Sequence, residues 1–318
     1  MNKYIIRRLL LVFPTLFLLS LLIFGLLRIL PGDVADMLLA DEGGSGASKA
    51  TANALRHQLG VDRPLYIQYT SWVWDLVRGD LGTSLADRSS IGKQLLVRLP
   101  ITLQIALMAQ VLGMAIGIPI GILSAMKQNT FLDYTLRFCS IVLLAAPTFW
   151  VALLLILAGA IWFHWSPPIG YNPIWEGPKD NLLQVIWPVL ILASHGMASD
   201  ARITRSSMLE VLREDYVRTA RAKGLRERVV IYRHALKNAL IPVITLSGLG
   251  FAGLLGGTVI MELIFSIPGM GSWLVTSIRI HDYTVVQSLI VVLATFFMLV
   301  NLAIDLLYGW LDPRISYA

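Results

Sequence analysis

The sequence predicts an all-α membrane protein with six transmembrane helices, and three observations support this: composition, long uncharged runs and the placement of lysine and arginine. Of the 318 residues, 56% are hydrophobic and 14% are charged, whereas soluble domains carry about 25% charged residues. So little charge indicates that much of the surface faces lipid. The net charge of +6 favours an anionic membrane surface over nucleic acid, because the basic residues stand beside apolar runs.

Six uncharged runs are candidates for the membrane-crossing helices, each of which needs about 20 apolar residues. The first run is too long for the apolar region of a signal peptide, which has about 7–15 residues, so we expect it to be a retained helix. The run 182–199 is the shortest and contains His195, which makes it the weakest candidate. The six runs are 9–27, 99–126, 138–163, 182–199, 238–261 and 284–304.

The segments between these runs differ in lysine and arginine content. The segment 200–237 has ten such residues, 127–137 has two and the N-terminal segment has three, whereas 164–181 and 262–283 have one each. Short loops rich in these residues stay in the cytoplasm. The asymmetry therefore predicts that both termini are cytoplasmic.

The predicted spans divide the chain into four parts. Residues 1–30 are the cytoplasmic N-terminus and the first span, and residues 31–98 are an external loop. Residues 99–310 form a five-helix core, and residues 311–318 form a cytoplasmic tail.

The external loop has a composition of its own. Residues 43–52 are rich in Gly, Ser and Ala, which is typical of a flexible stretch. Two short helices are expected over 50–58 and 65–77, ended by Gly60 and Gly79, because glycine is favoured just after a helix.

Glycines at helical spacing mark two of the spans. Gly113, Gly117 and Gly121 form two overlapping G-x-x-x-G patterns, which allow helix backbones to approach closely. Gly250 and Gly253 belong to a glycine-rich stretch of the fifth span. We interpret these glycines as helix-packing positions, with a moving, pore-lining helix as the alternative.

The basic segment 200–237 has two helical patterns. Ser207 and Glu210 fit a capping box at the start of the first, and Gly224 ends it. Two interpretations fit equally well: a helix pair lying on anionic lipid, or a docking element for a soluble partner. The apolar residues of the first pattern are Leu209, Leu212, Tyr216 and Ala220, and those of the second are Leu225, Val229, Tyr232, Leu236 and Leu240.

Motifs for several enzyme classes are absent or misplaced. The G-x-G-x-x-G at 248–253 lies inside an apolar run instead of following a strand, so it is not a dinucleotide site. The sequence has no P-loop motif, and its histidines have no metal-ligand spacing. Arg28 and Glu262 stand at the ends of runs, where we expect them to reach water. No group of acidic residues stands at mid-span, which disfavours an ion-coupled secondary transporter.

Two consecutive segments form a more specific motif: Asp215-Tyr-Val-Arg-Thr-Ala-Arg-Ala-Lys-Gly224-Leu and Arg233-His-Ala-Leu-Lys-Asn-Ala-Leu-Ile-Pro242. Further short segments are Pro31-Gly-Asp33 and the terminal Asp312-Pro-Arg314. In this order they resemble binding-protein-dependent ABC importer permeases of the dipeptide/oligopeptide/nickel family, over nearly the whole chain. Arg218, Thr219 and Ala220 replace the Glu-Ala-Ala of the general coupling motif, which narrows the resemblance to the peptide-type subfamily.

The resemblance implies a type I ABC importer permease that performs no covalent chemistry and holds no cofactor. It implies pairing with a homologous second permease in the lipid bilayer of a bacterial inner membrane, and no contact with nucleic acid. Two cytoplasmic ATPase subunits would bind ATP and Mg²⁺, and an external binding protein would deliver a di- or oligopeptide or a similar small solute. An ion-coupled secondary transporter is the alternative.

The resemblance also implies two groups of functional residues. Coupling to the ATPases would run through residues 207–224, and a second group would lie near the external gate or the binding protein. The coupling residues are Asp215, Tyr216, Arg218, Thr219, Ala220, Arg221, Ala222 and Gly224. The external residues are Glu262, Phe265, Pro268 and Gly269.

Overall fold

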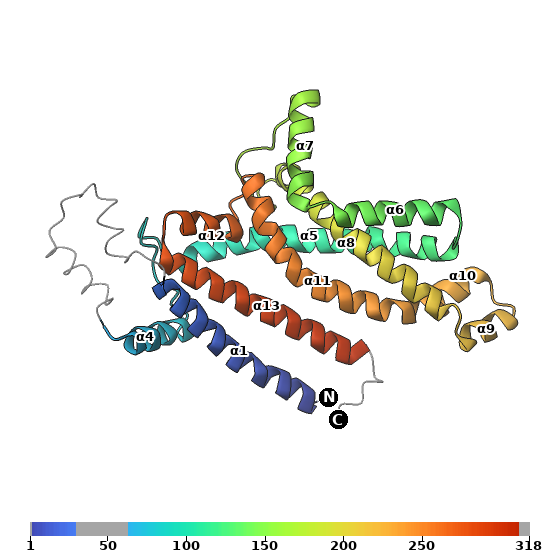
Figure 1. Ribbon diagram of the computed structural model, residues 1–318, viewed down its shortest axis with the longest axis horizontal. Helices are drawn as coiled ribbons and strands as arrows, with labels where there is room; N and C mark the ends of the chain where they lie inside the picture. The colour runs from blue at the N-terminus through green and yellow to red at the C-terminus, as the bar shows by residue number, and fades with distance from the viewer. Residues whose placement is uncertain (1, 30–62, 312–318) are drawn as a thin grey trace. The chain divides into compact units, whose positions relative to one another are not determined.

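The computed structural model describes residues 2–29 and 63–311, and these residues are almost entirely helical (Figure 1). They fall into two compact units, one built from residues up to 100 together with 272–299, the other from 101–271 and the chain after 299. The helices are α1 (Asn2–Ile29), α4 (Leu65–Val77), α5 (Ile91–Met126), α6 (Phe131–Ala145), α7 (Thr148–Phe163), α8 (Pro178–Val211), α9 (Asp215–Ala222), α10 (Glu227–Val229), the π-helical turn η1 (Val230–Ala235), α11 (Leu236–Ile264), α12 (Met270–Arg279) and α13 (Tyr283–Leu311).

In the first unit, aromatic residues join α1 to α4. The ring of Phe24 lies 5.4 Å from that of Tyr69 and 6.1 Å from that of Trp72, and the hydroxyls of Ser20 and Tyr69 are 2.8 Å apart. Helix α4 has the bounds expected from the sequence, and Gly79 follows it with φ +81°. The expected helix over 50–58 and its Gly60 lie outside the described residues.

Hydrogen bonds join the turn before α13 and the first turns of α13 to the segment that precedes α5. One carboxylate oxygen of Asp282 accepts hydrogen bonds from the Ser84 hydroxyl at 2.7 Å and from the backbone N–H of Leu85 at 3.0 Å. The Ser288 hydroxyl donates to the carbonyl of Leu81 at 2.8 Å. These bonds satisfy a buried carboxylate and fix an irregular loop within the first unit.

The second unit is a helical core in which α8 packs against α6, α7 and α11 (Figure 1). Its largest apolar cluster includes Ile105 of α5, Val189 of α8 and Met261 of α11, which are all fully buried or nearly so. A second cluster joins α5 and α8 to η1 through Ile122, Met208 and other side chains. The helices therefore bury one face each and leave other apolar faces exposed, as membrane spans do.

By length and composition, five of the described helices can cross a bilayer: those starting at Leu10, Ile91, Pro178, Glu227 and Tyr283. The pair α6 and α7 makes a sixth if it counts as one span. The expected six spans agree with this description, and the weakest candidate, 182–199, belongs to the continuous helix α8.

The expectation of one continuous third span over 138–163 was wrong, because α6 and α7 meet at a bend of 96°. Pro147 causes the break: proline has no N–H to donate and disfavours helical geometry in the residue before it. Ala146 is accordingly extended, with φ −78° and ψ 121°.

Candidate functional site

The segment between α8 and α11 forms a compact elbow built on α9. Helix α8 ends at Val211, α9 follows at Asp215–Ala222, and Gly224 turns the chain with φ +76°. Val217, which is 0% exposed, and Ala220 pack against Val230 of η1. These apolar contacts attach α9 to the end of the helical core.

The opposite face of α9 is exposed and polar. Tyr216 is 40% exposed, and its hydroxyl accepts a hydrogen bond of 2.8 Å from the side-chain amide of Asn238. The Arg221 guanidinium donates to both carboxylate oxygens of Glu227, at 2.7 and 3.2 Å, and these bonds raise the pKa of Arg221 above its ordinary value. Of the predicted coupling residues, the exposed ones are Asp215, Tyr216, Arg218, Thr219, Arg221, Ala222 and Gly224.

Two expectations for this segment were wrong. Ser207 lies inside α8 and does not cap a new helix, because α8 continues unbroken from the membrane run. The apolar stripe does not include Tyr216, since the turn at 212–214 resets the helical phase and points Val217 inward in its place; Ala220 is buried as expected. Gly224 ends the first helical pattern, as the sequence predicted.

The glycines of α5 lie against α8. A Cβ on Gly117 would come within 2.6 Å of the carbonyl oxygen of Met197, and one on Gly121 within 2.5 Å of the Cβ of Thr204. Both distances are shorter than real Cβ contacts allow, whereas a Cβ on Gly113 would lie 3.3 Å from the carbonyl oxygen of Ala193, a tight but less severe contact. By contrast, a Cβ on Gly250 or Gly253 would meet nothing within 4 Å, so close packing does not require these two glycines.

Glu262 was expected to reach water, and this was wrong: its side chain is 0% exposed. The Thr102 hydroxyl donates to Glu262 Oε1 at 2.6 Å, and the same hydroxyl accepts from the backbone N–H of Met270 at 2.9 Å. A Cβ on Gly269 would collide with the Glu262 carboxyl group. The carboxylate therefore organises the turn from α11 to α12, beside the buried Phe265; Pro268 belongs to the same turn.

A buried ion pair, which the sequence did not indicate, links α6 to α8. Nε and a terminal nitrogen of Arg205 each lie 2.8 Å from a carboxylate oxygen of Asp133, and the Asp133 carboxylate also accepts from the Ser124 hydroxyl at 2.5 Å. Asp133 is 0% exposed and Arg205 is 18% exposed. The bidentate geometry joins the ends of α5 and α6 to α8.

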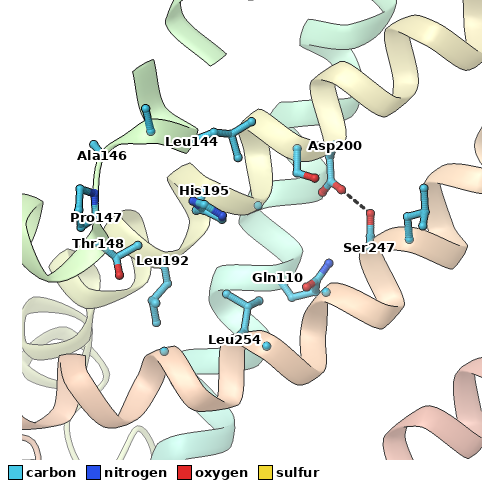
Figure 2. A pocket seen from close by; sticks show the side chains of 17 residues that line it. Gln110, Leu144, Ala146, Pro147, Thr148, Leu192, His195, Asp200, Ser247 and Leu254 are labelled. Carbon is cyan, nitrogen blue, oxygen red and sulfur yellow. Dashed lines mark hydrogen bonds between the residues drawn. The ribbon is translucent and has the colours of Figure 1, made fainter. Parts of the chain in front are cut away.

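A cavity of about 500 Å³ lies where α5, α8, α11 and the bend between α6 and α7 meet. Figure 2 shows His195 and Asp200 on α8, Ser247 and Leu254 on α11, and Gln110 on α5 around it. Asp200 is 2% exposed and accepts a hydrogen bond from the Ser247 hydroxyl. The sequence analysis considered only groups of acidic residues at mid-span and did not single out Asp200, which stands just past the uncharged run 182–199 but well inside α8.

Long apolar helices around a largely apolar cavity with a few polar side chains, and a basic elbow at one end, are what a multi-pass membrane permease requires. A sequence profile described as "Binding-protein-dependent transport system inner membrane component" matches residues 117–317, and its N-terminal counterpart matches residues 1–106. The chain belongs to this family, the permease subunits of ABC importers, in which ATP hydrolysis is carried out by a separate subunit. It is therefore a permease and not an enzyme.

Relatives extend over the whole chain. The dipeptide transport system permease protein DppB of Alkalihalophilus pseudofirmus is 40% identical over 337 residues, covering 100% of both chains. The di/tripeptide transport system permease protein DppB of Pseudomonas aeruginosa is 40% identical over 337 residues, covering 100% of this chain and 99% of its own. The Escherichia coli (strain K12) dipeptide permease DppB is 38% identical over 341 residues, with the same coverage.

A solved structure supports the fold. The crystal structure of an amino acid ABC transporter with histidines superimposes with a TM-score of 0.51 at 18% identity, covering 70% of this chain and 94% of that chain. At this identity the likeness concerns the fold alone.

Proposed function

We propose that this permease carries di- or oligopeptides, or similar small solutes, across a bacterial inner membrane. The observation that carries the proposal is full-length similarity to proteins named as dipeptide and di/tripeptide permeases. An external binding protein would deliver the solute, and a homologous second permease would complete the passage. Two ATPase subunits holding ATP and Mg²⁺ would supply the energy.

A transport test addresses the solute. Co-expression of this chain with its partner permease, ATPases and binding protein in a host without peptide uptake should restore uptake of radiolabelled dialanine. Omitting this chain alone should abolish that uptake. If the complete set were to carry other solutes but no peptide, the peptide assignment would be wrong.

We further propose that the α9 elbow is the contact through which the ATPases act, with both termini on the same cytoplasmic side. The contact is supported by the exposed polar face of α9 and by the apolar face that packs against the core. The cytoplasmic side is supported by the ten Lys and Arg residues of 200–237. Because Val217 and Ala220 hold α9 to the core, a push on its exposed face would be transmitted to α8 and α11.

Adjacent positions on α9 allow a matched test of this contact. In a Cys139→Ser background, Tyr216→Cys carries its thiol on the exposed face, whereas Val217→Cys carries it on the buried face. A thiol-specific photoactivatable cross-linker should join the Tyr216→Cys variant, but not the Val217→Cys variant, to an ATPase subunit in the assembled importer. Cross-linking to lipid alone from Tyr216→Cys would support the membrane-surface interpretation instead.

A further inference from the structure

The cavity beside α8 and α11 has one charged group on its wall. Its volume of about 500 Å³ lies within the range of roughly 300–1,000 Å³ that is usual for small-molecule sites. Of the residues that line it, Asp200 is the only acidic one and none is Lys or Arg. Two basic residues follow Asp200 on α8: Arg202 is exposed, and Arg205 is paired with Asp133.

The hydrogen bonding of Asp200 is incomplete. Its Oδ1 accepts from the Ser247 hydroxyl, whereas its Oδ2 is buried and has no hydrogen-bond partner among the described residues. A buried carboxylate without a full set of partners is costly, and inside a membrane span such groups are usually functional. The missing partner would be a hydrogen-bond donor, and a positively charged one would be favoured most.

The rest of the wall leaves room for a ligand. A Cβ on Gly196, Gly250 or Gly253 would meet nothing within 4 Å, although all three glycines line the cavity. Glycine inside a helix costs roughly 0.5–1 kcal/mol relative to alanine, and packing explains none of these three. Absent side chains widen the cavity on the α8 and α11 walls, next to the apolar Leu192 and Leu254.

We propose that this cavity is a station on the solute's path, where Asp200 binds the primary ammonium group of the peptide and the glycine-lined, apolar wall accommodates its side chains. The proposal rests on peptides being the solute, as argued above. Ser247 holds the carboxylate toward α11, and the polar side chains of Gln110 and His195 offer further hydrogen bonds to the peptide backbone.

The complete importer in proteoliposomes, with its binding protein, tests the proposal through Asp200→Asn, which keeps the shape of the side chain and removes its charge. Dialanine uptake per ATP hydrolysed should fall by about tenfold or more, because a hydrogen bond to a charged group is stronger than a neutral one. ATPase stimulation by the loaded binding protein should persist. Thr204→Val is the matched control, since Thr204 is buried in the same helix but does not line the cavity, and it should retain the wild-type ratio.

A second measurement separates ammonium binding from a structural role. In the importer without its binding protein, held in nanodiscs, millimolar dialanine should raise the unfolding temperature of the wild type. N-acetyl-dialanine should not raise it, and the Asp200→Asn variant should respond to neither peptide. Equal shifts with both peptides, no shift with dialanine, or a wild-type uptake ratio in Asp200→Asn would overturn the proposal. Absence of any ATP-dependent peptide uptake by the wild type would instead refute the peptide function on which it rests.

Discussion

Replacing Gly224 by valine should loosen the α9 elbow while leaving the membrane helices intact. Gly224 has φ +76°, and a Cβ at this position would meet nothing within 4 Å. The cost of a side chain is therefore conformational and not steric. For an L-residue the left-handed region costs roughly 1–2 kcal/mol, and a β-branched residue is among the worst there.

An energy of this size shifts local populations measurably. A cost of roughly 1–2 kcal/mol corresponds to a factor of about 5–30 in an equilibrium. In Gly224→Val, the state in which α9 is locally unfolded from the core should become more populated by that factor. Asparagine tolerates positive φ, which makes Gly224→Asn the matched control with little expected change.

Amide hydrogen exchange reads this opening directly, because it reports the free energy of local unfolding. In the assembled importer, amides of α9 should exchange about 5–30-fold faster in Gly224→Val than in the wild type, with amides of α8 unchanged. Uptake per ATP hydrolysed should fall in parallel. Wild-type exchange and wild-type transport in the valine variant would show that this turn neither depends on glycine nor takes part in coupling.

Three further tests, the first with a control substitution, address the packing of the core and the elbow. Gly121→Ala places a methyl group 2.5 Å from the Cβ of Thr204 and should destabilise the protein by about 1–3 kcal/mol. Gly250→Ala, whose methyl group would lie in open space, should not lower the unfolding temperature in detergent. Equal effects of the two substitutions would contradict the close approach of α5 to α8. Asp133→Asn strands Arg205 and should cost about 3 kcal/mol, the lower end for a broken buried pair, because Arg205 keeps 18% exposure; an unchanged thermal midpoint would refute this. Ala220→Glu buries a charge beneath α9 itself and should expose the elbow to limited proteolysis, so a protease pattern like that of the wild type would show that this face is not buried.

The features that the sequence predicted well are those fixed locally. Uncharged runs locate the spans because lipid excludes charge over a helix length, and the bounds of α4 follow from its flanking Pro64 and Gly79. Gly224 ends its helix because few other residues adopt its backbone conformation.

The features that the sequence missed depend on distant contacts. An apolar run indicates that a segment avoids water, but it does not give the path of the helix axis. The 96° bend at Pro147 was therefore not inferred, although the proline is present in the sequence. Glu262 stands at the end of a run, and only its bond to Thr102, 160 positions away in the chain, shows that it is buried. The partnership of Asp200 with Ser247 was hidden in the same way, because it joins two different helices.

The measurement that tests the central claim most directly is dialanine uptake by proteoliposomes that contain this chain, its partner permease and the ATPases. The account predicts uptake that requires both ATP in the lumen of the proteoliposomes and the binding protein in the external medium. A proton or sodium gradient alone should not drive this uptake. Uptake driven by an ion gradient without ATP would contradict it and would make the chain an ion-coupled transporter.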